Sequence, residues 1–253
     1  MLIRSRWNFT LAAPATLPKT YRLELVKELC RRMEIDRVDV VTNLSFSGIL
    51  GEVDTHRDFI SFSGDRPYHI ILSGLDATAS KAIADLDLSD GLELFGAKFQ
   101  QRDRTDETTT YEQLYTTCVA NEPEPNYSFD LEFHTPTAFS QRIISLPLPV
   151  PASLFRSWLL RWNHFAPIYL GSDELISYLT EYTFIRRHRI RTRSFPLPKG
   201  YVNGFIGEVS LQILRRSDPL LANVANLLMS YAPFAGTGVK TRLGMGHTSV
   251  VSL

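Results

Sequence analysis

The sequence predicts an α+β protein made of two copies of one β-α-β-β-α-β unit. Strand-like and helix-like hydrophobic periods follow one another in that order in each half of the 253 residues. A polar, proline-containing stretch at about 119–128 (VANEPEPNYS) divides the chain near its middle and is typical of a linker. The apolar fraction of 44% is ordinary for a chain that buries a core, so we expect small domains at 1–120 and 128–253.

The first half opens with a predicted strand over Leu2–Ala12, where apolar residues alternate. A helix is predicted after Pro18, because apolar residues recur at helical spacing on one face as far as Met33. The remaining predicted elements of this half are strands at Val40–Leu50 and Pro67–Leu75, a helix at Asp76–Leu88, and closing strands at Leu92–Gln101 and Thr110–Val119.

The second half repeats the order from a strand at Phe129–Phe133. Its last predicted helix begins at Asp218 and Pro219, which are favoured residue types at a helix start. The other predicted elements are a helix at Pro151–Phe165, strands at Glu181–Phe195 and Tyr201–Leu214 around the turn Pro196–Gly200, a helix at Asp218–Tyr231 and a strand at His247–Leu253. This order is that of the ferredoxin-like (RRM-like) fold, so two tandem ferredoxin-like domains are predicted.

The charge of the chain is balanced overall but not along its length. Residues 1–125 hold 14 basic and 20 acidic residues, whereas residues 126–253 hold 13 and 7. A polyanionic partner is therefore expected mainly at the second half. Apolar runs are too short for a membrane span, and the two cysteines lie far apart, so we expect reduced thiols, a cytoplasmic location and no membrane partner.

A glycine-rich loop between the last predicted helix and strand has the most specific local pattern. It reads Gly236-Thr-Gly238-Val-Lys240-Thr-Arg242-Leu-Gly244-Met-Gly246. Glycines permit positive φ and close backbone approach, and exposed amides in such a loop bind phosphate. Because the loop follows a helix and enters a strand, it is neither a dinucleotide fingerprint nor a P-loop. A tight helix-to-strand connection without a ligand is the alternative.

A run of basic residues lies on the predicted strand before the hairpin turn. Alternation places four arginines on one face: Arg187, Arg189, Arg191 and Arg193. Arg186 and His188 complete the run. Adjacent guanidinium groups repel one another unless an anion lies among them, and RNA phosphates are such an anion. A solvated face paired with glutamates is the alternative, but acidic residues are scarce after Glu181.

Among the six histidines, His56 lies in a polar loop beside Arg57. Histidine exchanges protons near neutral pH, so His56 is the candidate general base or acid, with a surface histidine of no special role as the alternative. His69 and His164 are expected to be structural, because they lie in or beside apolar elements. Histidine and cysteine show no metal-ligand spacing, so neither a metal nor another cofactor is expected.

The glycine-rich loop resembles the signature of the CRISPR-associated repeat-cleaving endoribonucleases, which belong to the RAMP superfamily. The run 131–139 (LEFHTPTAF) is similar to the start of their second domain. Further similar runs are Ser45–Gly51, Trp158–Pro167 and Gly204–Ser210. The resemblance covers most of the chain and points to the repeat-processing branch, with a cyanobacterial-type member expected.

The resemblance implies metal-independent cleavage of CRISPR repeat RNA, which is expected to be a small hairpin. The RNA's own 2′-OH attacks the adjacent phosphate, leaving 2′,3′-cyclic phosphate and 5′-OH ends. Many relatives have a histidine near the end of the first helix, where this chain has Cys30, Arg31 and Arg32. We therefore expect His56 as base or acid and Arg31 as the charge-stabilising cation; Arg32, Arg22 or Lys240 could replace Arg31.

Two other functions remain open. One is a non-catalytic RAMP subunit that holds guide RNA together with other CRISPR effector subunits. The other is an unrelated two-domain enzyme whose glycine-rich loop binds a small phosphorylated ligand. The arginine run favours RNA over a small ligand, and the runs at 131–139 and 158–167 favour the nuclease over the subunit.

Overall fold

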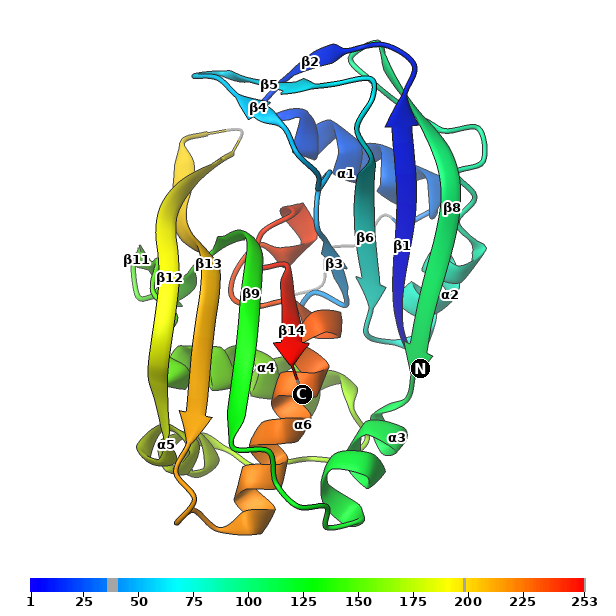
Figure 1. Ribbon diagram of the computed structural model, residues 1–253. Coiled ribbons are helices and arrows are strands. Elements are labelled where there is room, and N and C mark those ends of the chain that lie inside the picture. The colour runs from blue at the N-terminus through cyan, green and yellow to red at the C-terminus, as the bar shows by residue number, and fades with distance from the viewer. Residues whose placement is uncertain (36–40, 198, 253) are drawn as a thin grey trace.

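A computed structural model describes residues 1–35, 41–197 and 199–252 (Figure 1). Two main sheets lie next to each other, and helices cover the rear face of each as drawn in Figure 1. Each sheet has its own core of buried apolar residues. The helices that the structure describes include none long and apolar enough to cross a membrane.

The first sheet has the strand order β3-β6-β1-β8-β7. Its ferredoxin-like elements are β1 (Leu2–Leu11), α1 (Tyr21–Arg32), β3 (Leu44–Phe46), β6 (Tyr68–Gly74), α2 (Ala77–Asp85) and β8 (Ala97–Thr109). Asp76 caps α2 by accepting a hydrogen bond from the amide of Ala79 (2.7 Å). Additional short strands are β2 (Ala15–Pro18), β4 (Asp54–Thr55), β5 (Phe59–Phe62) and β7 (Leu92–Leu94).

The second sheet has the order β12-β13-β9-β14, so both units place the first and third strands of the fold at the centre. Its elements are β9 (Ser128–Thr137), α4 (Pro151–Phe165), α5 (Asp173–Tyr182), β12 (Thr183–Pro196), β13 (Tyr201–Ile213), α6 (Pro219–Ala235) and β14 (Thr248–Ser252), with a small hairpin of β10 (Phe139–Gln141) and β11 (Ile144–Leu146). The prediction of two ferredoxin-like units is confirmed.

The predicted strand at Thr110–Val119 is wrong. This segment forms α3 (Tyr111–Tyr115) and a π-helical turn, η1 (Thr116–Ala120). Thr110 and Gln113 form a capping box, which fixes the helix start. Tyr111 then packs edge-on against Trp162, at a centroid distance of 5.1 Å, so this segment belongs to the second core. The real closing strand of the first unit is β8, which runs as far as Thr109.

Other predicted bounds shift by a few residues. The strand expected from Glu181 begins at Thr183, because the unpredicted helix α5 precedes it. The strand expected over Val40–Leu50 is shorter, at Leu44–Phe46. Val40, its predicted first residue, lies outside the described residues, as does Leu253, the predicted last residue of the final strand.

Candidate nucleic-acid interface and active site

The amides of the glycine-rich loop do not form the exposed cradle that the sequence suggested. Each glycine amide donates a hydrogen bond within the fold: Gly236 to Ala232 O, Gly238 to Ser157 Oγ, Gly244 to Thr241 O and Gly246 to Pro136 O. These donors are already satisfied, so they are not available to a phosphate. The predicted cradle of exposed amides is therefore wrong, whereas RNA binding by the loop residues stays a prediction.

The glycines are needed because the loop packs against other backbone. A Cβ on Gly238 would lie 2.2 Å from Ala138 O, and one on Gly246 would lie 1.9 Å from Thr237 O. Lys240 has a left-handed backbone, φ 57° and ψ 31°, and its carbonyl accepts hydrogen bonds from the amides of Leu243 and Met245. The fold thereby presents the exposed side chain of Lys240 on the outside of a fixed loop.

Arg22 of α1 lies against this loop. A Cβ on Gly244 would meet Arg22 Cδ at 3.5 Å, and one on Gly48, in the loop after β3, would meet Arg22 Nε at 2.9 Å. The guanidinium group lies 5.6 Å from the ring centroid of Phe195, at the end of β12. Its Nε is buried and has no hydrogen-bond partner in the described part of the chain. Three segments distant in sequence therefore converge on this arginine.

Arg242 of the glycine-rich loop also contacts α1. Its guanidinium group lies 3.6 Å from the Sγ atom of Cys30. Cys30 is two turns beyond Arg22, on the same stripe of the helix. One face of α1 and the loop residues Lys240 to Gly244 thus form a basic corner, which we define by Arg22, Lys240 and Arg242.

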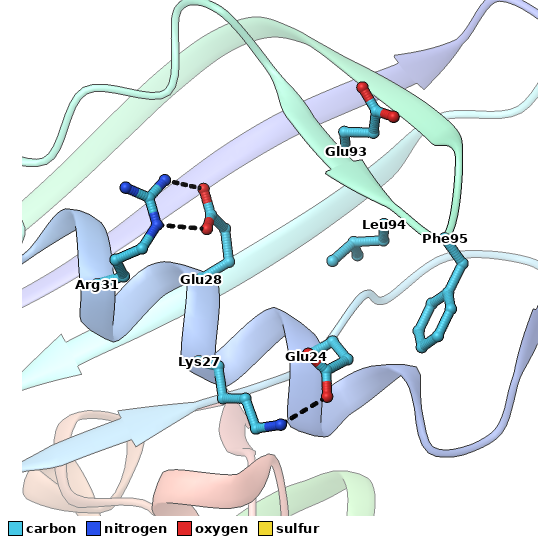
Figure 2. A pocket seen from close by; sticks show the side chains of 7 residues that line it. All are labelled: Glu24, Lys27, Glu28, Arg31, Glu93, Leu94 and Phe95. Carbon is cyan, nitrogen blue, oxygen red and sulfur yellow. Dashed lines mark hydrogen bonds and ion pairs between the residues drawn. The ribbon is translucent and has the colours of Figure 1, made fainter.

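Arg31 points away from the basic corner. Figure 2 shows its guanidinium group turned to Glu28, to which it donates two hydrogen bonds of 2.8 and 2.7 Å. These bonds lower the pKa of Glu28 to about 2, opposed by burial and reinforced by Arg32. Arg31 lines a surface pocket of about 350 Å³ with Glu93 of β7 and Phe95 of the β7–β8 turn (Figure 2). Arg31 is therefore compensated by a carboxylate, and its role as the charge-stabilising cation stays a prediction.

Arg32 is also paired with carboxylates. It contacts both Glu28 and Asp90. Of the substitutes considered for Arg31, only Arg22 and Lys240 lie at the basic corner.

His56 lies in the turn between β4 and β5 and is exposed, as the sequence suggested. Its amide donates to Phe59 O at 2.9 Å, which closes the turn. Within the described ranges, its ring forms no hydrogen bond or ion pair with Arg31 or with the glycine-rich loop. Its participation in catalysis stays a prediction.

The arginines of β12 share one face, as predicted. Residues paired across two strands point to the same side of a sheet. The β12 arginines pair with β13 residues that point away from the core: Arg187 with Ser210, Arg189 with Glu208, Arg191 with Ile206 and Arg193 with Gly204. Arg186 lies at an irregularity in the register, and His188 pairs with the buried Val209, so His188 belongs to the other face. β12 is the edge strand of its sheet.

This face, which we call the arginine face, borders a groove of about 540 Å³. Its lining includes Arg189, Arg191, Glu208, Glu132 and His134. Among the residues that the structure describes, none of the β12 arginines forms an ion pair, although Glu208 lies opposite Arg189. The acidic side chains occupy the inner strands β13 and β9, and the arginines occupy the outer edge.

A small apolar cluster joins the arginine face to the glycine-rich loop. It contains Phe195 from β12, Ala138 and Met245, with Val239 and Leu243 packed against it. The β12–β13 hairpin and the loop are thereby held as one unit. The β12 arginines and the loop cations Lys240 and Arg242 consequently belong to one continuous part of the second domain. Arg22 of α1 contacts this part from the first domain.

A histidine cluster also lies between the two sheets, and sequence reasoning did not identify it. His134 Nε2 lies 2.7 Å from Ser249 Oγ, and the rings of His134 and His247 are 5.4 Å apart. Burial, followed by the proximity of His134, Arg4 and His69, holds the pKa of His247 well below its usual range. Their wide separation in sequence gave no signal of this proximity.

Comparisons with known proteins agree with the fold. Residues 131–248 match the family described as CRISPR-associated endoribonuclease Cas6. A Streptococcus thermophilus CRISPR-associated endoribonuclease Cas6 is 24% identical over 129 residues. That match covers 51% of this chain and 52% of the relative, so the chain spans about half the length of the curated relative it matches.

Solved Cas6 structures resemble the whole chain. A Cas6 product complex has a TM-score of 0.72 at 20% identity, covering 100% of both chains. Thermus thermophilus Cas6 has a TM-score of 0.71 at 18% identity, covering 99% of this chain and 98% of that one. A Cas6-related protein from Pyrococcus furiosus gives 0.69 at 13%, covering 100% and 99%. The predicted resemblance is confirmed: residues 131–248 match the model of the CRISPR-associated endoribonuclease Cas6 family, and the chain as a whole has the fold of the solved Cas6 structures.

Proposed function

We propose that this protein is an endoribonuclease that binds and cuts CRISPR repeat RNA. The observation that carries the proposal is the arginine face, whose four guanidinium groups have no carboxylate partner in the described residues and whose strand ends on the glycine-rich loop. Such a surface binds a polyanion, and an edge strand fits along the phosphates of an RNA stem. The Cas6 family match makes a CRISPR repeat the expected RNA.

The chemistry proposed for the site is transesterification within the RNA. The 2′-OH loses its proton to a base and attacks the adjacent phosphorus. The bond to the 5′-oxygen of the next nucleotide breaks, and that oxygen takes a proton from an acid, which leaves 2′,3′-cyclic phosphate and 5′-OH ends. Charge accumulates on the phosphorane oxygens, so we assign Arg22, Lys240 and Arg242 at the basic corner to stabilise it.

His56 is kept as the proposed base or acid. Its exposure leaves the ring accessible to RNA. His56→Ala is expected to slow cleavage of a labelled CRISPR repeat by about 10²-fold while RNA binding is retained. An unchanged rate would remove His56 from the reaction.

The test incubates the protein with a labelled CRISPR repeat in the presence of EDTA. A single cut is expected, with a 2′,3′-cyclic phosphate on the upstream product. The matched control is the same repeat with a 2′-deoxy substitution at the scissile nucleotide, which should bind but resist cutting. Cleavage that needs added divalent metal, or that persists on the 2′-deoxy RNA, would contradict the proposed mechanism.

A non-catalytic RAMP subunit is the second candidate. The observation in its favour is that the described contacts of Arg22 are with tyrosine, phenylalanine and glycine, with no histidine beside them. Such a protein would bind the repeat tightly and leave it intact. The EDTA assay distinguishes the two, because it measures binding and cutting on the same RNA.

A further inference from the structure

Arg161 of α4 is a buried arginine beneath the glycine-rich loop. Only 8% of the residue is exposed. Its guanidinium group donates to Gly238 O at 2.7 Å and to Ser157 Oγ at 2.8 Å, and it reaches Thr241 Oγ1 at 3.5 Å. Two of these acceptors lie in the loop, on either side of Lys240.

The neighbours of Arg161 are neutral. Its hydrogen-bond acceptors are carbonyl and hydroxyl oxygens, and no carboxylate is bonded to it in the described parts of the chain. Burial lowers the pKa of Arg161 from its ordinary value, and Tyr231 opposes this change. A buried cation without a counter-ion is costly, so its position calls for a reason beyond filling space.

Two more residues on the same face of α4 hold the loop. Ser157 Oγ accepts the amide of Gly238 at 2.8 Å, and Trp158 Nε1 donates to Thr237 Oγ1 at 3.0 Å. Together with Arg161, they fix the loop on both sides of Lys240, whose backbone is in the left-handed region. The loop's conformation therefore depends on α4 as well as on its own glycines.

We propose that Arg161 is a positioning residue, which acts on the cleavage reaction by fixing Lys240 and Arg242 at the basic corner. This inference rests on the proposed endoribonuclease function. Arg161 is covered by the loop and does not itself touch RNA. Its hydrogen bonds set where the two loop cations lie, and small displacements of groups that stabilise a transition state slow a reaction strongly.

The test measures single-turnover cleavage of a CRISPR repeat by Arg161→Gln. Glutamine keeps a hydrogen-bonding side chain but cannot span Gly238 and Thr241 together. We expect cleavage to slow by about 10- to 100-fold, with a much smaller change in the affinity for uncleavable 2′-deoxy repeat. Arg161→Lys, which keeps the charge and one hydrogen bond, should recover part of the rate. The matched control is Arg156→Gln on the same helix, whose arginine forms a surface ion pair with Asp173.

A double-mutant cycle separates positioning from general loss of stability. If Arg161 acts through Lys240, then Arg161→Gln should have little further effect on the cleavage rate in a Lys240→Ala background. Effects that multiply independently, or an Arg161→Gln rate equal to wild type, would overturn the inference.

The variants also distinguish this inference from the proposed function. A wild-type protein that does not cut the repeat contradicts the function itself. A wild type that cuts, with Arg161→Gln equally active, contradicts only the role of Arg161. Should Arg161→Gln fail to fold, Ser157→Ala decides: it removes one acceptor of Arg161 and the partner of the Gly238 amide, and an unchanged cleavage rate in that folded variant would overturn the inference.

Discussion

Arg22 and Arg31 lie on the same helix, about two and a half turns apart, but their guanidinium groups have different neighbours. Arg31 is bonded to Glu28 on the exposed side of α1. Arg22 contacts the aromatic rings of Tyr21 and Phe195, and its Nε has no partner in the described residues. An arginine whose charge is not compensated has more to offer a phosphate, because no carboxylate must be displaced.

This contrast predicts opposite outcomes for one substitution at two positions. Arg22→Gln should slow cleavage of repeat RNA by about 10²-fold, because a cation that stabilises the phosphorane is lost. Arg31→Gln should leave the rate within about a factor of two, since it removes only an exposed ion pair. Single-turnover cleavage with saturating protein measures both. Equal effects of the two substitutions would contradict the assignment of Arg22.

The sequence could name these arginines but could not rank them. Helical spacing predicts that Arg22 and Arg31 lie on different faces of α1, yet it does not say which face meets the glycine-rich loop more than 200 residues later. The same limit applies to the loop. Its glycines were recognised, but their role in close packing against Ala138 and Thr237 depends on segments that only the fold brings together.

At the scale of elements, β12 tests the electrostatic interpretation of RNA binding. Changing Arg189 and Arg191 together to Ala should weaken repeat binding and reduce the slope of log affinity against log salt by about 1.8, if each arginine neutralises one phosphate. The control changes Arg215 and Arg216 after β13, which removes the same charge from the same half of the chain. Titrations at several salt concentrations measure the slope. A double variant with wild-type slope would show that the arginine face does not contact RNA.

Regular elements were predictable where the hydrophobic period was long. β1, α2, α4 and the β12–β13 hairpin all follow clear patterns. The segment after Thr109 was misread as a strand, although Thr110 and Gln113 form a capping box that the sequence displays. Tertiary packing decides this segment, because Tyr111 docks between Trp162 and Tyr231 of the second core.

On the scale of the whole molecule, contacts between the two units determine how the site is assembled. Tyr111 donates to Leu75 O at 2.8 Å, and Ser45 Oγ donates to Phe234 O at 3.4 Å. These contacts fix β3 and the end of β6 relative to α6 and the second core. A repeated β-α-β-β-α-β order predicts the two units, but it does not predict their mutual orientation. The basic corner could therefore not be derived from the sequence pattern.

The histidine cluster between the sheets predicts how stability depends on pH. Burial is the main cause of the lowered pKa values of His69, His134 and His247, and nearby Arg4 contributes in each case; the pKa of His69 falls to about 4. Glu132 opposes the change at His134. In an unfolded chain, histidine titrates near about 6.5. Between these values the unfolded chain binds more protons than the folded protein does, so the free energy of unfolding falls as the pH drops.

The cluster's contribution should therefore be fully present above about pH 6.5 and be lost progressively down to about pH 4. Thermal unfolding at about pH 7.5 and about pH 5 measures this loss as a lower Tm in acid. His69→Gln, which cannot be protonated in this range, should lose less on acidification than wild type does, whereas the exposed His164→Gln should behave like wild type. An identical acid-induced fall in Tm in all three proteins would show that His69 does not contribute to the pH dependence of stability.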